Sequence, residues 1–113
     1  MDLSIIVVSF NTKELLKQCL KSVFKQTKGI NFEIIVIDNA SKDRSPEMVQ
    51  KEFPKVVLIK NKKNLGFAVG NNLGVKEAKG RYILLLNSDT KLIEDSLTKM
   101  VDWMEKNQKV GVY

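Results

Sequence analysis

Four short clusters of amide, hydroxyl and carboxylate side chains each follow an apolar run in this chain of 113 residues. Asn, Asp, Ser and Gly are the residues that turns and helix caps use, so one such cluster alone indicates only a loop. Four clusters after four apolar runs favour a second explanation, in which their polar groups converge on one polar ligand. The clusters are Ser9-Phe10-Asn11, Asp38-Asn39, Asn64-Leu65-Gly66 and Asn87-Ser88-Asp89.

The side chains of these clusters suit different parts of a nucleotide. The carboxylate of Asp38 can accept a hydrogen bond from the ring N–H of uracil or thymine, with the apolar face of Phe10 beside it. Asp89 is a hard anionic ligand for Mg²⁺ or Mn²⁺, and such an ion binds one or two protein carboxylates together with substrate phosphate oxygens. The ion would neutralise charge on a departing nucleoside diphosphate, and Asn87 could hydrogen-bond the ribose or a metal-bound water. We therefore expect a pyrimidine nucleotide site with a divalent cation.

Three glycines at a spacing of four, Gly66, Gly70 and Gly74, lie at the start of a predicted helix. Each lowers helix stability by roughly 1 kcal/mol relative to alanine, so a close contact must compensate. That contact is the packing of the helix on a sheet, the approach of a ligand to the helix N-terminus, or both. The spacing differs from G-x-G-x-x-G, and no glycine-rich turn follows the first apolar run. This argues against an oxidoreductase that binds a dinucleotide with Asp38 on the ribose.

Strand and helix patterns alternate along the chain with short connections. Apolar runs without alternation predict buried strands, as in a parallel sheet, at 3–8, 33–37, 56–59 and 82–86. Amphipathic or capped segments predict helices at 12–27, 45–53, 67–79 and about 97–104, and residues 110–113 predict the start of a fifth strand. The order predicts a Rossmann-like α/β fold, with a mostly parallel sheet and helices on both faces. In such a sheet ligands bind at the carboxyl ends of the strands, where all four polar clusters should lie.

Local signals refine the predicted helix ends. Ser45 is a candidate N-cap with Pro46 at the first helical position, and the third helix should end at Gly80. Cys19 falls on the apolar face of the first helix, which favours a core residue over a catalytic thiol.

Composition limits the classes of function. The net charge is +6 and the chain has no histidine, which excludes a histidine general base and a histidine-rich zinc site within these residues. The positive charge could serve a nucleic acid, an anionic membrane or a phosphate-bearing ligand. The lysines at 60, 62 and 63 have no interleaved aromatic residues, which argues against nucleic acid. One cysteine and no targeting segment predict an intracellular, cytoplasmic protein.

Four ordered segments resemble the family 2 glycosyltransferases of GT-A fold, and above all their rhamnosyltransferase-like branch. These segments are 7–11, 36–43, 64–72 and 85–90. The resemblance implies that Phe10 and Asp38 contact the base, and that Asn87-Ser88-Asp89 occupies the place of the family's D-x-D motif, with Asn87 in place of the first acid. Asp89 is then the metal ligand, and the nucleotide-binding candidates are Ser9, Phe10, Asn11, Asp38, Asn39, Asn64, Gly66, Asn71, Asn87 and Ser88.

The resemblance also implies a larger enzyme of polysaccharide biosynthesis. Family members are about twice as long, and their second half holds the acceptor and supplies the catalytic base. We therefore interpret residues 1–113 as the donor-binding half of a domain truncated at its C-terminus and inactive alone. No catalytic residue is assigned within these residues, and the general base is expected beyond Tyr113.

The parent enzyme would transfer a sugar from a UDP- or dTDP-sugar to a glycan or lipid-linked acceptor, with inversion and metal assistance. Its expected location is the cytoplasm, with peripheral association at the inner membrane face and homo-oligomers as further expectations. The alternative is a noncatalytic nucleotide-binding or interaction module of the same fold.

Overall fold

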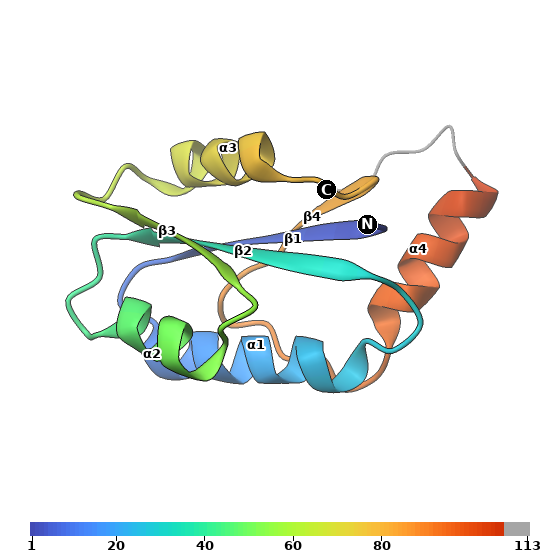
Figure 1. The fold of residues 1–113 in the computed structure, drawn as a ribbon, viewed down its shortest axis with the longest axis horizontal. Helices are drawn as coiled ribbons and strands as arrows, with labels where there is room; N and C mark the ends of the chain where they lie inside the picture. Colours follow the sequence, from blue (N-terminus) through green and yellow to red (C-terminus); the bar gives the residue numbers. More distant parts are fainter. Residues whose placement is uncertain (108–113) are drawn as a thin grey trace.

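Four strands form one parallel sheet in the computed structural model, which describes residues 1–107 (Figure 1). The strands are β1 (Leu3–Ser9), β2 (Phe32–Asn39), β3 (Val57–Asn61) and β4 (Tyr82–Leu85), in the order β3-β2-β1-β4. All three neighbouring pairs are parallel. Every residue of β1 is buried, which explains why its sequence is apolar without alternation from Ile5 to Val8. The predicted α/β fold with a parallel sheet is therefore confirmed.

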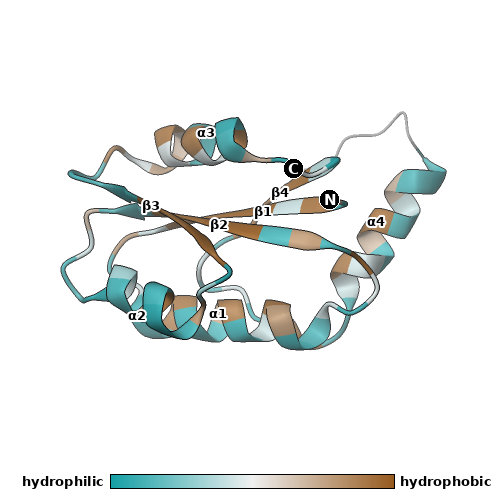
Figure 2. Ribbon diagram, in the orientation of Figure 1, coloured by the Kyte–Doolittle hydropathy of each residue, from teal (hydrophilic) through white to brown (hydrophobic). Residues whose placement is uncertain are grey.

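Helices cover both faces of this sheet, as predicted. They are α1 (Lys13–Gln26), α2 (Ser45–Glu52), α3 (Phe67–Glu77) and α4 (Ser96–Lys106). Figure 1 shows α3 on one face of the sheet and α1 and α2 on the other. The larger core lies on the side of α1 and also contains Leu97 and Val101 of α4, while the smaller core lies beneath α3. Figure 2 shows hydrophobic strands at the centre of the fold, whereas the helices carry hydrophilic and hydrophobic residues in turn.

The order of the strands reverses between β1 and β4. The connections from β1 to β2 and from β2 to β3 proceed in one direction across the sheet, and the next connection, through α3, returns past β1 to β4. In open α/β sheets the crevice at such a reversal, outside the carboxyl ends of the strands, is where ligands bind. A ligand site is therefore expected at the carboxyl ends of β1 and β4.

Two of the three spaced glycines allow α3 to lie directly on β1. A Cβ atom at Gly70 would lie 2.9 Å from Val8 Cγ1, and one at Gly74 would lie 2.5 Å from Ile6 Cγ2. Packing on the sheet therefore accounts for both. Gly66 differs, because a Cβ there would meet nothing within 4 Å. Its φ of +87° at the N-cap of α3 is the feature that favours glycine.

Two predicted helix ends were wrong for identifiable reasons. Ser45 is the first residue of α2, after Arg44 in a left-handed conformation, and its amide and hydroxyl both donate to Oδ1 of Asp43. The carboxylate at position 43 thus replaces Ser45 as the capping acceptor. Helix α3 ends at Glu77, before the residue predicted to stop it, because Gly80 must lie against β1, where its Cβ would meet the Ser4 amide nitrogen at 2.5 Å.

Strand β2 is longer than predicted and includes Asp38 and Asn39, which were assigned to the following loop. Two expectations concern the end of the chain. The strand predicted at 110–113, which includes Tyr113, lies outside the described residues. The general base expected beyond Tyr113 lies outside them as well, so its position stays a prediction.

Candidate functional site

The carboxyl ends of β1, β2 and β3 lie level with one another. In the sheet register Ser9 pairs with Asp38, and Asp38 pairs with Lys60. The segments after β3 and β4 reach the same edge, since Asn39 Nδ2 donates to the Gly66 carbonyl at 3.1 Å and the Thr12 hydroxyl donates to Ser88 Oγ at 3.3 Å. The four polar clusters of the sequence therefore lie along one edge.

A chain of hydroxyl groups joins the end of β1 to the segment after β4. The oxygens of Ser9 and Thr12 lie 2.9 Å apart, and Thr12 donates onward to Ser88, which is 76 residues away in the sequence. Because the Thr12 proton is used for Ser88, the Ser9 hydroxyl donates to Thr12. This arrangement leaves the Ser88 hydroxyl able to donate to a ligand at the strand reversal.

Asn11 fastens the loops after β1 and β2 to one another. Its backbone amide donates to Ser41 Oγ at 2.9 Å, and its side-chain Oδ1 accepts from the Lys42 backbone amide at 2.8 Å. Asn11 has a φ of 54°, a left-handed conformation that asparagine tolerates better than most residues. Its side-chain oxygen is thus committed to positioning the loop.

Asp38 is a buried carboxylate with one satisfied oxygen. The residue is 2% exposed, and its Oδ2 accepts a hydrogen bond from the Ser41 amide at 2.9 Å. The other oxygen, Oδ1, is buried and has no hydrogen-bond partner among the described residues. Leaving a buried acceptor unpaired costs free energy, about 1 to 3 kcal/mol and more for a charged group. A ligand that gains access to Oδ1 and donates to it would recover that cost.

Asn39 and Asn64 hold the start of α3 in place. Asn39 donates to the Gly66 carbonyl and accepts from Asn61 Nδ2 at 2.8 Å, while Asn64 Oδ1 accepts from the Gly66 amide at 2.9 Å. Both ends of the Asn39 amide are therefore used within the chain. The role that these contacts support directly is to set the position of the loop and of Gly66.

The remaining predicted site residues differ in exposure. Phe10 is 47% exposed directly after β1, and Asn87 and Asp89 are exposed after β4. Asn71 is 7% exposed on the buried face of α3, next to Gly70. Because Asn71 is buried in α3, its side chain is largely inaccessible to a ligand at the outer surface of the helix.

Asp89 acts electrostatically on the core thiol of α1. Cys19 is fully buried, as predicted, and its Sγ lies 3.8 Å from the Asn87 carbonyl oxygen. Burial raises the pKa of Cys19 to about 11, and the negative charge of Asp89 contributes to the rise. The thiol thus stays neutral at physiological pH, which supports its role as a core residue.

Comparison with known proteins shows the family of this chain. The model of the family described as Glycosyl transferase family 2 matches residues 4–113. The chain belongs to glycosyltransferase family 2.

Two curated relatives show how much of a family 2 protein is present here. An uncharacterized glycosyltransferase of Haemophilus influenzae is 35% identical over 109 residues, which cover 96% of this chain and 36% of that protein. The UDP-Glc:alpha-D-GlcNAc-diphosphoundecaprenol beta-1,3-glucosyltransferase WfaP of Escherichia coli is 33% identical over 103 residues, which cover 90% of this chain and 41% of WfaP. The family 2 chain thus spans little more than a third of the length of these relatives.

A solved structure shares the fold. The crystal structure of S. aureus TarS 1-349 in complex with UDP-GlcNAc is 26% identical, with a TM-score of 0.84, over 96% of this chain and 32% of that one. The α/β sheet of the family 2 chain therefore has the GT-A arrangement. Within residues 1–107, every helix is too short or too polar to cross a lipid bilayer.

The oxygen ligands at the carboxyl edge of the sheet fit one kind of metal site. Within the described range, no three acidic or cysteine side chains cluster as metal ligands. Asp89 is an exposed carboxylate next to the Ser88 hydroxyl, and both are hard oxygen donors. This set fits a Mg²⁺ or Mn²⁺ ion that takes its other ligands from water and phosphate, and does not fit an ion enclosed by protein groups alone.

Sequence reasoning missed the residues that link the clusters. Thr12, Ser41 and Asn61 each bridge two segments of this edge. Polar residues that follow apolar runs were a signal that these three positions lie at the carboxyl edge of the sheet. The sequence did not identify their hydrogen-bond partners, which lie 22 to 76 residues away in the chain. The missing information was which loops meet, and the strand order supplies it.

Proposed function

We propose that this family 2 domain binds the nucleoside diphosphate of a UDP- or dTDP-sugar, and that the protein containing it transfers the sugar to an acceptor with inversion. The single observation that carries the proposal is the unpaired, buried Oδ1 of Asp38 at the carboxyl edge of the sheet. Uracil and thymine carry a ring N–H that can donate to it. Guanine also has a ring N–H, but its second ring would need room beside Phe10 that the smaller pyrimidine does not require.

The rest of the edge is assigned by chemistry. The exposed ring of Phe10 offers an apolar face to the base, and the Ser88 hydroxyl and Asn87 amide can donate to ribose or phosphate oxygens. Asn11, Asn39, Asn64 and Gly66 shape the site by fixing its loops. Ser9 supports the site through its hydroxyl contact with Thr12, and Asn71 lies buried in α3. In this assignment a few residues contact the ligand, and the others hold those residues in position.

Asp89, with the phosphate oxygens of the donor, would hold the divalent cation. When bound, Mg²⁺ or Mn²⁺ supplies positive charge that stabilises a departing nucleoside diphosphate. The residues of this chain bind the base, orient the diphosphate at the reversal between β1 and β4, and keep the Asp38 contact shielded from water. Such fixed positioning lowers the barrier of a transfer between two bound molecules.

The proposal places the acceptor site and the catalytic base beyond Tyr113. An inverting transfer needs a base for the acceptor hydroxyl, and the carboxylates of the edge are assigned to the nucleotide base and the cation. The name of WfaP specifies UDP-glucose as donor and a diphosphoundecaprenol-linked acceptor, and a glycan or lipid-linked acceptor of the same class is what we propose for the full protein. A cytoplasmic location, peripheral membrane association and homo-oligomers stay predictions.

Titration calorimetry with nucleoside diphosphates tests the donor assignment. We expect UDP and dTDP to bind in the presence of Mn²⁺, and ADP and GDP to bind at least tenfold more weakly. Equal or tighter binding of the purine nucleotides would overturn the assignment of Asp38 to the base. For the full-length protein, donor binding without any sugar transfer to polyprenyl-linked acceptors would favour the noncatalytic alternative.

A further inference from the structure

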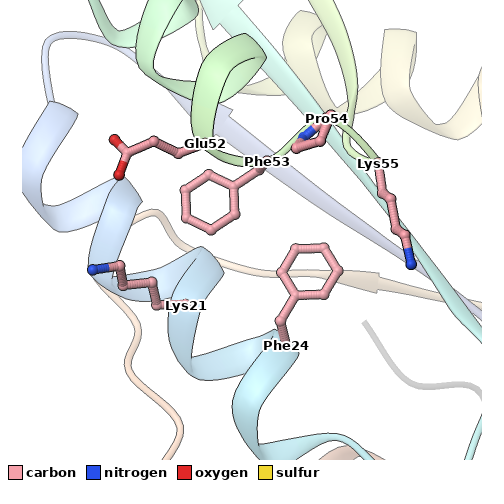
Figure 3. A pocket seen from close by; sticks show the side chains of 6 residues that line it. All are labelled: Lys21, Phe24, Glu52, Phe53, Pro54 and Lys55. Atoms are coloured by element: carbon pink, nitrogen blue, oxygen red, sulfur yellow. The ribbon is translucent and has the colours of Figure 1, made fainter.

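Two neighbouring hollows flank Lys21 on the outer side of α1, away from the edge assigned to the nucleotide. The larger has a volume of about 360 Å³ and lies where α1 meets the end of α2, and the smaller has a volume of about 200 Å³. The larger hollow includes Lys55, two residues before the start of β3. It thus lies toward the amino ends of the strands, whereas the nucleotide edge lies at their carboxyl ends. The larger hollow is lined by Lys21, Phe24, Glu52, Phe53, Pro54 and Lys55 (Figure 3).

The larger hollow has a rigid aromatic wall. The rings of Phe24 and Phe53 are stacked, with centroids 6.1 Å apart and planes inclined by 9°, and Phe24 also packs against Phe32 at 5.6 Å. Phe53 belongs to the main core and is 8% exposed. The aromatic surface is therefore recessed and held in place by the core, so it can receive an apolar side chain without first being ordered.

Positive charge without a partner surrounds this wall. The one carboxylate that lines the hollow, Glu52, is paired with Lys17 at 3.1 Å. Among residues 1–107, no ion pair is recorded for Lys21 and Lys55, which Figure 3 shows on opposite sides of the two rings, or for Lys25 and Lys91, which line the smaller hollow. The two hollows share Lys21, so one extended ligand could contact the apolar wall and all four ammonium groups.

We propose that this surface, Lys21, Lys25, Phe24, Phe53, Lys55 and Lys91, binds an acidic segment of a partner polypeptide that inserts one aromatic or large aliphatic side chain against Phe24 and Phe53. The recessed wall matches a protruding side chain, and the lysines match carboxylates on either side of it. A flat anionic membrane fits less well, because its insertion would require apolar side chains that protrude from the protein. A nucleic acid would use the lysines and leave the aromatic wall unfilled.

Fluorescence anisotropy with a labelled peptide tests the proposal on the whole chain. The probe is a peptide with one tryptophan flanked on both sides by glutamates, and its partner probe has alanine in place of tryptophan. We expect the tryptophan peptide to bind at least tenfold more tightly than the alanine peptide. The double variant Lys21→Gln/Lys55→Gln should weaken binding of the tryptophan peptide about tenfold or more.

Matched controls locate the effect. The double variant Lys76→Gln/Lys106→Gln removes two exposed lysines from α3 and α4 and should leave peptide affinity within twofold of the wild type. Amide resonances of residues 21–25, Phe53 and Lys55 should shift on titration with the tryptophan peptide, and UDP binding should be the same in all variants. The surface lies away from the donor edge, so the peptide test gives the same answer whether or not the wild-type chain binds UDP.

Three results would overturn the proposal. The first is no anisotropy change with the tryptophan peptide. The second is equal affinity for the tryptophan and alanine peptides, which would show a general attraction for polyanions. The third is binding to phosphatidylserine vesicles that depends on Lys21 and Lys55 while the peptide fails to bind, which would assign the surface to a membrane.

Discussion

Gly74 of α3 lies directly against Ile6 of β1, with 2.5 Å between the position that a Gly74 Cβ would occupy and Ile6 Cγ2. Ile6 is fully buried in the smaller core beneath α3. This contact sets the distance between the helix and the sheet. It therefore also sets where Gly66, at the start of α3, meets the edge that carries the candidate site.

The variant Gly74→Ala should destabilise the domain although alanine is the better helix former. The gain in helix propensity is roughly 1 kcal/mol, whereas forcing a methyl group into a packed interface costs typically about 1 to 3 kcal/mol. We expect a net loss of about 1 kcal/mol in the free energy of unfolding, measured by urea denaturation. The control Asn72→Ala changes an exposed position of the same helix and should leave stability unchanged or slightly raised. A Gly74→Ala protein more stable than the wild type would contradict the tight packing.

Stability should depend on the ionisation of Cys19 at alkaline pH. The pKa of Cys19 is raised from 9.0 to about 11, mainly by burial and further by Asp89. The unfolded chain therefore loses this proton at lower pH than the folded chain, so the stabilisation is complete below pH 9 and is lost as the pH rises to about 11. By linkage the loss is about 2 to 3 kcal/mol. Urea denaturation between about pH 8 and 11 measures it.

Other side chains also contribute to the change of stability at alkaline pH, so the matched variant Cys19→Ala isolates the thiol. The decline above pH 9 should be smaller in Cys19→Ala than in the wild type by the amount given above. In addition, Asp89→Asn should lower the pKa of the thiol, while burial keeps it above 9.0. Parallel pH profiles for wild type and Cys19→Ala would show that the thiol is not desolvated as described.

The strands and the edge of the sheet could be predicted from the sequence because they depend on local patterns. Strand β1 is buried on both faces, and the apolar run from Ile5 to Val8 is the direct result. The carboxyl-edge rule then placed Asp38 and Asp89 on one side of the sheet without knowledge of the strand order. The cap of α2 could not be predicted with the same certainty, because Asp43 and Ser45 are both good caps and the choice depends on the backbone of Arg44.

The contacts that organise the candidate site were beyond local reasoning. The link from Thr12 to Ser88 exists only because β4 lies beside β1, and nothing near Thr12 in the sequence encodes that neighbour. The unpaired oxygen of Asp38 is a second example. Its residue type suggested a base contact, but its burial results from tertiary packing, and only the structure shows that Oδ2 is bound by the Ser41 amide while Oδ1 has no partner.

Mn²⁺ should strengthen nucleotide binding only when Asp89 is present. If the ion is held between Asp89 and the diphosphate, Mn²⁺ should tighten UDP binding by about tenfold, which corresponds to about 1.4 kcal/mol. In Asp89→Ala the affinity for UDP should be the same with and without Mn²⁺. The control Asp102→Ala removes an exposed carboxylate from α4 and should keep the Mn²⁺ effect. An undiminished Mn²⁺ effect in Asp89→Ala would assign the ion to other groups.

Residues 1–113 alone should transfer no sugar, because the carboxylates of Asp43, Asp95 and Glu94 are already held in contacts within the chain. Burial acts to raise the pKa of Asp43, but hydrogen bonds from the Ser45 hydroxyl and the Lys13 and Ser45 amides outweigh it and lower the pKa. The pKa of Asp95 is lowered by the Lys28 amide above all, and Asp95 also caps α4. Carboxylates with lowered pKa values are poor general bases.

Glu94 forms an ion pair with Lys99, with 3.6 Å between Oε1 and Nζ, so this carboxylate also has a partner within the chain. Mass spectrometry of mixtures containing the chain, Mn²⁺, a UDP-sugar and a polyprenyl-linked acceptor should detect no glycosylated product. A product that forms with the wild-type chain and disappears in Asp89→Ala would mean that the base lies among these residues and not beyond Tyr113.

The identity of the base-reading group can be tested by reversing its hydrogen-bonding character in Asp38→Asn. The Ser41 amide donates to Oδ2 of Asp38, so an asparagine would keep its oxygen there and place its NH₂ group where the unpaired Oδ1 now lies. That group donates instead of accepting. It would oppose the ring N–H of uracil and match the unprotonated ring nitrogen of cytosine.

Calorimetric titration of wild type and Asp38→Asn with UDP and with CDP measures this reversal directly. The wild type should prefer UDP, and Asp38→Asn should lose about ten- to a hundredfold in UDP affinity, as expected for one hydrogen bond to a charged group, while its affinity for CDP is unchanged or rises. A UDP preference that persists unchanged in a folded Asp38→Asn protein would contradict the account.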